Sequence, residues 1–268
     1  MSKVEAPEYI FIVNPVAGRG QPNPIIERIH NVCRRRGLNY RVETTTHPKH
    51  ATEITKSLPK SGKIVFAVGG DGTLNEVLNG LMGTKNILGV IPDGTGNDFY
   101  DSLKRINQPR PKIDVGVVNG KHYYINSCGC GIDTEVSLTM TNMRNKKFIP
   151  ASQRYPLAIA KAILTFRAMR MEFSLGPGKS KSDRFMIVSA SNGRQVGGEY
   201  LIAPSADLQD GKLDICFAEK ISKLRLPPLI GALKSGKHGE DPNVHLRQTS
   251  HLKLKSPREI TMNLDGEF

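Results

Sequence analysis

The sequence is poor in features that mark several classes of protein. It has no tryptophan, and aromatic residues make up only 6% of its 268 residues. So few aromatic rings disfavour a platform on which single-stranded nucleic acid would stack, and no nucleic-acid partner is expected. No apolar run reaches the roughly 18 residues of a membrane-spanning helix, and the polar residues 1–7 lack the apolar core of a signal peptide. We therefore expect a cytoplasmic chain.

Cysteine is also scarce, and its spacing excludes the usual zinc ligand set. The chain has four cysteines, and none forms a CxxC pair that a second such pair follows downstream. Cys128 and Cys130 are too close in sequence to bridge if they alternate along a strand. We expect Cys33, Cys128, Cys130 and Cys216 to be free thiols in a reducing compartment.

Acidic residues are outnumbered, with 25 Asp and Glu against 38 Lys and Arg, which gives a formal net charge of +13. Residues 136–171 contain seven basic and no acidic residues, and residues 220–258 contain nine basic and two acidic residues. Such a balance favours an anionic partner, and basic segments gain roughly 1 kcal/mol per residue near an anionic membrane surface. A solvated charged face is the alternative.

The first 110 or so residues alternate strand and helix patterns, which is typical of a parallel sheet with helical crossovers. The predicted strands cover residues 9–13, 40–43, 64–68 and 87–91. The predicted helices cover residues 24–36, 51–58, 74–82 and 97–105.

The pattern changes near residue 112, so we predict one domain over residues 1–115 and a second over residues 116–268. A tight turn at Asn119-Gly120 predicts a hairpin. The second domain reads as mostly antiparallel, with strands at 114–118, 122–127, 185–190, 200–203, 213–218, 251–255 and 260–264. One helix, at about 156–171, interrupts these strands.

Three turns that contain glycine follow predicted strands, at residues 14–20, 69–73 and 92–99. In a parallel sheet they share the edge where ligands bind. Glycine lets the backbone approach a ligand, and the start of the next helix favours an anion, most often phosphate. Asp71 would repel phosphate, so the pattern predicts a divalent cation between them and a Mg²⁺-nucleotide site. The alternative is a tight turn in which Asp71 caps the helix.

The familiar fingerprints of two other nucleotide-binding classes are absent. The chain has no GxxxxGK[ST], which excludes a P-loop nucleoside triphosphatase, and no GxGxxG after a predicted strand, which disfavours a dinucleotide fold. Arg19, in the first glycine turn, is a candidate partner for phosphate.

Three motifs together resemble the diacylglycerol kinase catalytic family: NPVAG at 14–18, GGDGTLNE at 69–76 and GTGNDF at 94–99. That family includes soluble bacterial lipid kinases and the sphingosine and ceramide kinases. The middle motif is shared with NAD kinases and phosphofructokinases, whereas the first and third together are more specific. The resemblance implies an α/β fold, with a parallel-sheet nucleotide-binding domain of the NAD-kinase and diacylglycerol-kinase type before a mostly antiparallel β-sandwich domain.

The resemblance implies an ATP site on the first domain. Asp71 would serve the catalytic Mg²⁺, and Thr45 is flanked by two further threonines that could take its place. The residues implied for the nucleotide are Asn14, Thr45, Gly69, Gly70, Asp71, Gly72, Thr73, Asn75, Glu76 and Thr95.

Two further segments are similar to functional segments of the family. ADLQDGKLD at 206–214 resembles a loop that binds a structural Mg²⁺, with the Asp210 carboxylate and the Asp207 and Lys212 carbonyls as ligands. A surface β-turn is the alternative. NLDGE at 263–267 resembles the catalytic segment, in which Glu267 or Asp265 would accept the proton of an alcohol, although it could be a plain hairpin turn. Family members run on for some tens of residues beyond this segment.

The resemblance therefore implies an ATP- and Mg²⁺-dependent lipid kinase that moves the γ-phosphate to a diacylglycerol-like hydroxyl. Its lipid alcohol would lie at an anionic membrane surface, which a cytoplasmic protein meets at the inner face of the membrane. The identity of the lipid and a homodimeric state stay open. The alternatives are an NAD kinase-like or other small-molecule kinase, and a nucleotide-binding protein without turnover.

Overall fold

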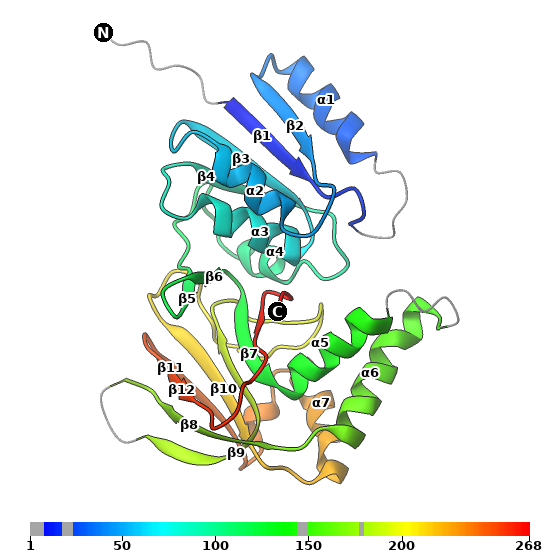
Figure 1. Ribbon diagram of the computed structural model, residues 1–268, viewed down its shortest axis with the longest axis vertical. Coiled ribbons are helices and arrows are strands. Elements are labelled where there is room, and N and C mark those ends of the chain that lie inside the picture. The colour runs from blue at the N-terminus through cyan, green and yellow to red at the C-terminus, as the bar shows by residue number, and fades with distance from the viewer. Residues whose placement is uncertain (1–7, 18–23, 144–148, 177–179) are drawn as a thin grey trace. The chain divides into compact units, whose positions relative to one another are not determined.

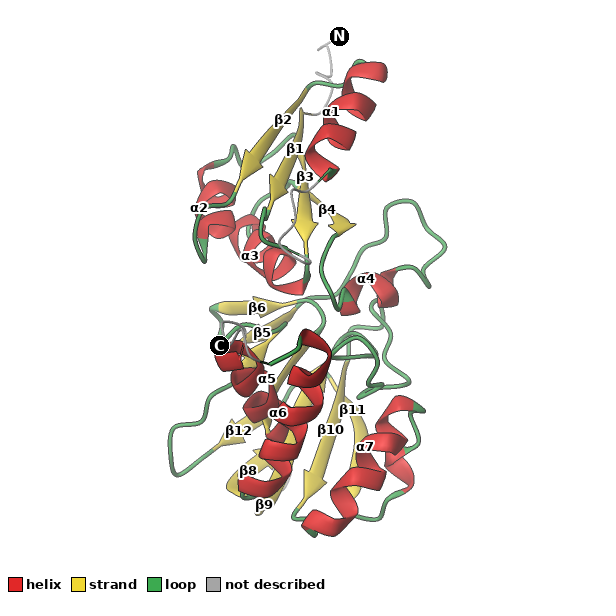
Figure 2. Cartoon of the chain, turned by 90° about the vertical axis from the view of Figure 1, so that its right-hand side faces the viewer, coloured by secondary structure: helices red, strands yellow, loops and turns green. Residues whose placement is uncertain are grey.

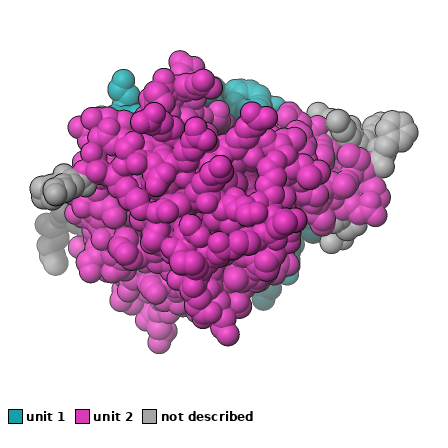
Figure 3. All heavy atoms as spheres, turned by 90° about the horizontal axis from the view of Figure 1, so that it is seen from below, with its two compact units in different colours: residues 1–101, 117–124 teal, residues 102–116, 125–268 magenta. Residues whose placement is uncertain are grey.

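The computed structural model describes residues 8–17, 24–143, 149–176 and 180–268. The chain divides into two compact units, coloured separately in Figure 3. Unit 1 comprises Met1–Asp101 and Val117–Tyr124, and unit 2 comprises Ser102–Gly116 and Ile125–Phe268. The predicted boundary after residue 115 rests on sequence pattern alone and stays a prediction.

The sheet of unit 1 is parallel throughout, as the alternation of strands and helices predicts. Its strands are ordered β2-β1-β3-β4 (Figure 1). The four strands are β1 (Glu8–Val13), β2 (Tyr40–Thr44), β3 (Lys63–Gly69) and β4 (Ile87–Pro92). Each predicted strand of this sheet is therefore confirmed, to within one residue at either end.

Helices cover both faces of this sheet, with α1 on one side and α2 and α3 on the other (Figure 2). The first face buries Phe11 and Val13 against Ile29 and Cys33 of α1. This is the stripe that the spacing of apolar residues predicts. The helices are α1 (Ile25–Arg35), α2 (His50–Ser57), α3 (Asp71–Leu81) and α4 (Asp98–Leu103).

A short hairpin joins the helices of unit 1. Strands β5 (Gly116–Val118) and β6 (His122–Tyr124) pair with each other. The Asn79 side chain donates to the carbonyl of Tyr123 at 2.9 Å and accepts from its N–H at 3.0 Å, and the Asn75 amide donates to the same carbonyl at 3.0 Å. These three bonds fasten β6 to α3.

Unit 2 is built on an antiparallel sheet, with seven strands in the part of the chain that the structure describes, which confirms the second half of the predicted fold class. The main path is β11-β10-β9-β7-β13, and β8 joins β9 to β12. The strands are β7 (Ser127–Gly131), β8 (Met169–Ser174), β9 (Lys181–Ser191), β10 (Leu213–Glu219), β11 (Val244–Thr249), β12 (Lys253–Lys255) and β13 (Asn263–Leu264).

Among the described residues, three α-helices accompany this sheet, where the sequence predicts one. They are α5 (Ile132–Met143), α6 (Ala151–Thr165) and α7 (Leu226–Lys234), with short 3₁₀ turns η1 (Lys223–Arg225) and η2 (His238–Glu240). One face of the sheet packs Ala218 and Val244 against Ile163 of α6 and Leu229 of α7. None of the described helices is both long and apolar enough to cross a membrane.

Several predictions in unit 2 are wrong in detail. Residues 200–203 form no strand, because Ile202 and Ala203 are buried in the cluster around α7 while the Leu201 N–H bonds to Leu233. The predicted helix at 156–171 lies at Ala151–Thr165, and Met169, Met171 and Phe173 then follow the two-residue period of β8. The predicted strand 122–127 is β6 and the start of β7, separated by two residues.

The four cysteines are buried free thiols, as predicted. Burial raises the pKa of Cys130 and Cys216 to about 12. Both thiols therefore stay protonated and inert near neutral pH, because the thiolate is the reactive form.

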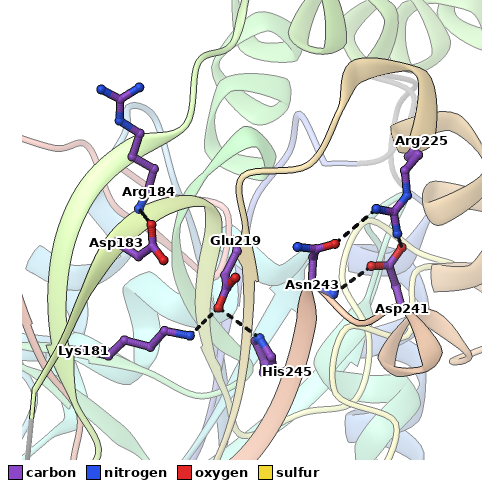
Figure 4. Close-up of polar contacts among 8 residues, drawn as sticks. All are labelled: Lys181, Asp183, Arg184, Glu219, Arg225, Asp241, Asn243 and His245. Carbon is purple, nitrogen blue, oxygen red and sulfur yellow. Dashed lines mark hydrogen bonds and ion pairs between the residues drawn. The ribbon is translucent and has the colours of Figure 1, made fainter.

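The segment between β10 and β11 carries η1, α7 and η2, and its two ends are fastened together (Figure 4). Glu219, at the end of β10, accepts from Lys181 and lies 3.2 Å from His245 of β11. Arg225 bonds to Asp241 at 2.6 Å and to the Asn243 side chain at 3.2 Å. These contacts hold the two ends of the segment between β10 and β11 close together.

His238 gives unit 2 a pH-dependent stability. Its ring is 2% exposed, and burial lowers its pKa below the ordinary 6.5. The unfolded chain therefore binds a proton more readily, and the contribution of this ring is complete above pH 6.5 and lost as the pH falls below it. We expect the free energy of unfolding to fall by up to about 1.4 kcal/mol per pH unit in that range.

Comparing the wild type with His238→Gln isolates this effect, because the glutamine amide can still donate to the Ile202 carbonyl, 3.2 Å from the ring Nε2. Asp133 opposes the trend, since burial raises its pKa to about 6, so folding favours its protonated form as the pH falls. Urea denaturation from pH 5 to 8 is the measurement. Parallel stability curves for the two proteins would refute the role of His238.

Candidate active site

The three glycine turns of unit 1 lie at the carboxyl edge of the parallel sheet. In register, the last residue of β1, Val13, pairs with Thr44 of β2 and Val68 of β3, and Gly69 pairs with Pro92 of β4. Residues 14–17 and 93–97 and the start of α3 all continue from these ends. The rest of the first turn, including Gly18 and Arg19, lies outside the described residues.

The second and third turns touch backbone to backbone. A β-carbon on Gly94 would lie 2.4 Å from the α-carbon of Gly70, a distance that no side chain could occupy. The Asp93 N–H also donates to the Gly69 carbonyl at 2.9 Å. Glycine is required here for the close approach of two loops. The first N–H groups of a helix such as α3 have no partner within the helix, which suits an anion.

Two carboxylates converge beside these turns. Asp71 accepts from the backbone N–H groups of Asp98 and Phe99, both at 3.2 Å, so it binds the first turn of α4. A β-carbon on Gly96 would lie 3.3 Å from Asp71 Oδ2 and 3.6 Å from Asp98 Oδ2. Burial raises the pKa of Asp71, and the two N–H groups oppose that shift. A divalent cation beside the pair would favour the charged form.

The structure brings some of the other predicted nucleotide-site residues together at this edge of the sheet. The Asn14 amide donates to the Thr73 hydroxyl at 3.1 Å, which joins the first motif to the second. Thr45 is buried directly after β2, where its N–H donates to Val13, and Thr95 is exposed in the third turn. Gly72 lies in the first turn of α3. These positions suit the nucleotide edge, and their roles stay predictions.

Asn75 and Glu76 are engaged within unit 1. Asn75 bonds to β6, as described above. The Glu76 carboxylate accepts from the N–H of Lys49 at 2.9 Å and of Ala51 at 3.1 Å, so it holds the start of α2. Glu76 therefore positions a neighbouring helix, and its predicted role toward a nucleotide stays untested.

The loop predicted to bind a structural Mg²⁺ is a pair of tight turns. Asp207 accepts from the Gln209 N–H and Asp210 from the Lys212 N–H, both at 2.9 Å. The Asp114 carboxylate reaches this loop from 97 residues away and accepts from Gly211 at 2.7 Å. Burial, and then the charge of Asp210, raise the pKa of Asp214. The predicted carbonyl ligands, those of Asp207 and Lys212, stay a prediction.

The predicted catalytic segment forms a two-residue hairpin turn. The Leu264 N–H donates to the Glu267 carbonyl at 2.8 Å, and the Glu267 N–H donates to the Leu264 carbonyl at 2.9 Å. Asp265 and Gly266 adopt positive φ angles of 52° and 95°, as the primed hairpin turns require. The hairpin interpretation of the sequence is therefore right for the backbone.

The two candidate bases of this turn differ sharply in their surroundings. The Asp265 carboxylate is 5% exposed and accepts three backbone N–H groups, those of Ile125 at 2.8 Å and of Asn126 and Ser127 at 2.9 Å. Glu267, two residues later, is exposed. Asp265 is thus held by the fold, whereas Glu267 is exposed to solvent.

Sequence reasoning missed two carboxylates that the structure places at these sites. Asp98 lies in the quoted GTGNDF motif, and its position right after a glycine turn could have marked it. Asp114 gives no local signal, because its partner loop is 97 residues away.

Two family models match the chain and together cover most of it. Residues 8–122 match the diacylglycerol kinase catalytic domain, and residues 126–268 match the YegS C-terminal NAD kinase beta sandwich-like domain. The diacylglycerol kinase of Bacillus subtilis (strain 168) is 29% identical, over 96% of this chain and 89% of its own length. A Yersinia enterocolitica protein named "Probable lipid kinase YegS-like" is 28% identical, over 97% of this chain and 90% of its own.

The fold also agrees with a solved structure. A diacylglycerol kinase from Bacillus anthracis (strain Sterne) superposes with a TM-score of 0.65 at 20% sequence identity, over 96% of this chain and 89% of that one. The superposition supports the architecture of both units.

Proposed function

Because this chain belongs to the diacylglycerol kinase family and is a lipid kinase, we propose that it transfers the γ-phosphate of ATP to the hydroxyl group of a diacylglycerol-like lipid, with Mg²⁺. The observation that carries the proposal is the pair of carboxylates, Asp71 and Asp98, beside two glycine turns at one sheet edge. A kinase needs this combination, since phosphate oxygens require both N–H donors and a cation.

The residues at this edge fit a Mg²⁺-nucleotide. Hard carboxylate oxygens are the ligands that Mg²⁺ prefers, and it binds proteins through one or two of them together with phosphate oxygens. Asp71 and Asp98 would hold the ion, which would neutralise the charge on the transferring phosphate. The backbone from Gly69 to Thr73 would hold the phosphates, with Asn14 fixing Thr73 beside them.

Glu267 acts as the general base in this proposal. It accepts the proton of the lipid hydroxyl while the hydroxyl oxygen forms a bond to the terminal phosphorus and the bond from that phosphorus to the leaving ADP oxygen breaks. Asp265 is the positioning residue, because its three hydrogen bonds to residues 125–127 fix the turn that presents Glu267. The exposure of Glu267 and the burial of Asp265 support this division of roles.

Phosphate transfer tests the proposal directly. Labelled ATP and Mg²⁺ are incubated with the protein and vesicles that carry diacylglycerol, phosphatidylglycerol, a polyprenol or a sphingoid base, with NAD in a parallel reaction. Label in one lipid supports the proposal and names the substrate. Label in NAD alone would assign the chain to small-molecule kinases. Nucleotide binding without label anywhere would mark a binding protein without turnover.

We also propose that the loop from Asp207 to Lys212 holds a structural Mg²⁺. Asp210 would give its carboxylate, and Asp207 and Lys212 their carbonyls. The bond from Gly211 to Asp114 and the effect of the Asp210 charge on the pKa of Asp214 support it, because they bring negative groups close together in this loop. A cation there would offset their repulsion.

The lipid substrate requires contact with a membrane, and one face of α6 suits an anionic surface. Leu157 and Leu164 are exposed at 44% and 71%, seven residues apart on the same side of the helix. The 3₁₀ turn η1 lies beside the end of α6, since the Lys223 ammonium donates to the Leu164 carbonyl. Leu224, in that turn, is 88% exposed. Exposed leucines among basic residues are typical of a surface that lies in a membrane interface.

We expect Leu164→Glu and Leu224→Glu each to weaken binding to anionic vesicles by roughly 10- to 100-fold, since burying a leucine contributes roughly 1.5–3 kcal/mol. The measurement is co-sedimentation with phosphatidylglycerol vesicles. Val32→Glu is the matched control. Val32 is an apolar residue of α1 that is 48% exposed, and its substitution adds the same charge. If all three variants bind as the wild type does, the membrane contact lies elsewhere.

A further inference from the structure

A cluster of metal-binding side chains lies apart from both predicted Mg²⁺ sites. Among the described residues, one group of three brings such atoms together, namely His47, His50 and Glu53. One ligand atom from each lies within 4.8 Å of the other two. His50 begins α2, and Glu53 follows three residues later on the same face of the helix. His47 reaches this face from the loop that leads out of β2.

The hydrogen bonds of both rings are made through Nδ1, so Nε2 is the nitrogen that each ring can offer to a metal. The Nδ1 of His47 lies 3.0 Å from the Pro48 carbonyl, to which it donates, so the lone pair is on Nε2. That Nε2 lies 3.7 Å from the Glu53 carboxylate. The Nδ1 of His50 accepts from the Thr46 N–H at 3.0 Å and also lies 3.1 Å from the Thr46 hydroxyl. A metal on Nε2 of His50 therefore requires the ring proton to move to Nδ1, where this hydroxyl can accept it. With a metal on Nε2, each ring would have at Nδ1 the outer oxygen partner that metal-bound histidines use.

The backbone that carries the cluster is held in place from α3. The Glu76 carboxylate accepts from Lys49 and Ala51, the residues on either side of His50. Lys49 is fixed with a positive φ of 68°, and the two imidazole rings stack with centroids 4.6 Å apart. The three ligands are therefore largely pre-organised, which lowers the cost of binding an ion.

From this geometry we propose that His47, His50 and Glu53 form a binding site for one divalent transition-metal ion of the Zn²⁺ class. Two neutral imidazoles and one carboxylate are ligands that Zn²⁺, Ni²⁺ and Cu²⁺ prefer, whereas Mg²⁺ prefers oxygen ligands and its own waters. Water completes the coordination, because the cluster lies at the surface.

Loading the site changes the bonding of Thr46. Without metal, the Thr46 N–H donates to Nδ1 of His50 at 3.0 Å. With metal on Nε2, Nδ1 carries the proton and donates to the Thr46 hydroxyl, and the Thr46 N–H loses this partner. Thr46 is thus a positioning residue. Thr46→Val keeps the shape of the side chain and removes the acceptor, so it is expected to weaken metal binding by roughly 10- to 100-fold.

Isothermal titration of the full chain with ZnCl₂ at pH 7.5, without an affinity tag, tests the proposal. We expect saturable binding of one ion per chain, which MgCl₂ in excess does not displace. His47→Ala and Glu53→Gln should each weaken binding by at least tenfold. Cobalt(II) in place of zinc should give the visible absorption of a low-coordinate site with nitrogen ligands, and this absorption should be lost in His47→Ala.

His251→Ala and Glu27→Gln are the matched controls, since both residues are exposed and lie outside the cluster. Circular dichroism without metal checks that every variant is folded. Absence of saturable zinc binding by the wild type would overturn the proposal. So would wild-type affinity in His47→Ala and Glu53→Gln together, because the ion would then sit elsewhere.

Discussion

Replacing Glu267 with glutamine is expected to lower kcat for lipid phosphorylation by roughly two to four orders of magnitude. Glutamine has nearly the same shape but cannot accept the hydroxyl proton. The side chain is exposed, so the fold should persist with an unchanged melting temperature. Initial rates with labelled ATP and lipid vesicles measure the effect, and the KM for ATP should stay near its wild-type value, because Glu267 acts on the acceptor alcohol.

Asp265→Asn provides the contrast, because this carboxylate works through the fold. Its two oxygens accept three buried N–H groups, and an amide cannot accept all three. Each buried donor left without a partner costs roughly 1–3 kcal/mol, so the melting temperature should fall along with activity. A Glu267→Gln variant with wild-type kcat, or an inactive Asp265→Asn variant with wild-type stability, would reverse the roles proposed for these two residues.

The sequence predicts unit 1 well because its signals are local. Most strands there are short apolar runs that end at a turn residue, and a helix pattern comes before the next strand. The order of these elements alone then requires a parallel sheet. The position of the ligand edge follows as well, since Asn14, Gly69 and Pro92 each stand at the end of a strand.

Unit 2 is less predictable because its elements depend on contacts between distant segments. Pro227 and Pro228 suggest a break in the chain, yet proline fits the first turn of a helix, and α7 begins there. The apolar residues Ile202 and Ala203 read as a strand but are buried as an irregular segment. The apolar composition of these two residues predicts that they are buried, and they are. It does not predict their backbone conformation, which depends on packing against α7, about 25 residues further along the chain.

The candidate site shows the same division. The glycine turns and Asp71 can be found from the sequence, because close backbone approach and charge are properties of residue type. The anchoring of Asp265 on residues 125–127 depends on a pairing across 138 to 140 residues. Such a pairing needs β13 to lie beside β7, which two residues of strand do not predict.

Asp71→Asn is the second change with a large expected effect, at least roughly a hundredfold loss of Mg²⁺-dependent ATP turnover. The variant removes one of the two charges that converge near Gly96, and a preorganised electrostatic contact of this kind contributes roughly 10²–10³ in kcat. The asparagine oxygen can still accept one of the N–H groups of Asp98 and Phe99, so the loss of stability should be small. Turnover is measured against Mg²⁺ concentration, with circular dichroism as the test of folding.

The Mg²⁺ dependence separates the two roles that Asp71 has in the structure. If Asp71 only fastens α4, the variant should have a lower melting temperature and a wild-type response to Mg²⁺. If it also holds the ion, the Mg²⁺ concentration for half-maximal turnover should rise sharply at nearly constant stability. Glu27→Gln removes an exposed carboxylate from α1 of the same unit and should leave both quantities unchanged. A wild-type Mg²⁺ profile in Asp71→Asn would indicate that Asp98 holds the metal instead, because an oxygen of this second carboxylate also faces Gly96.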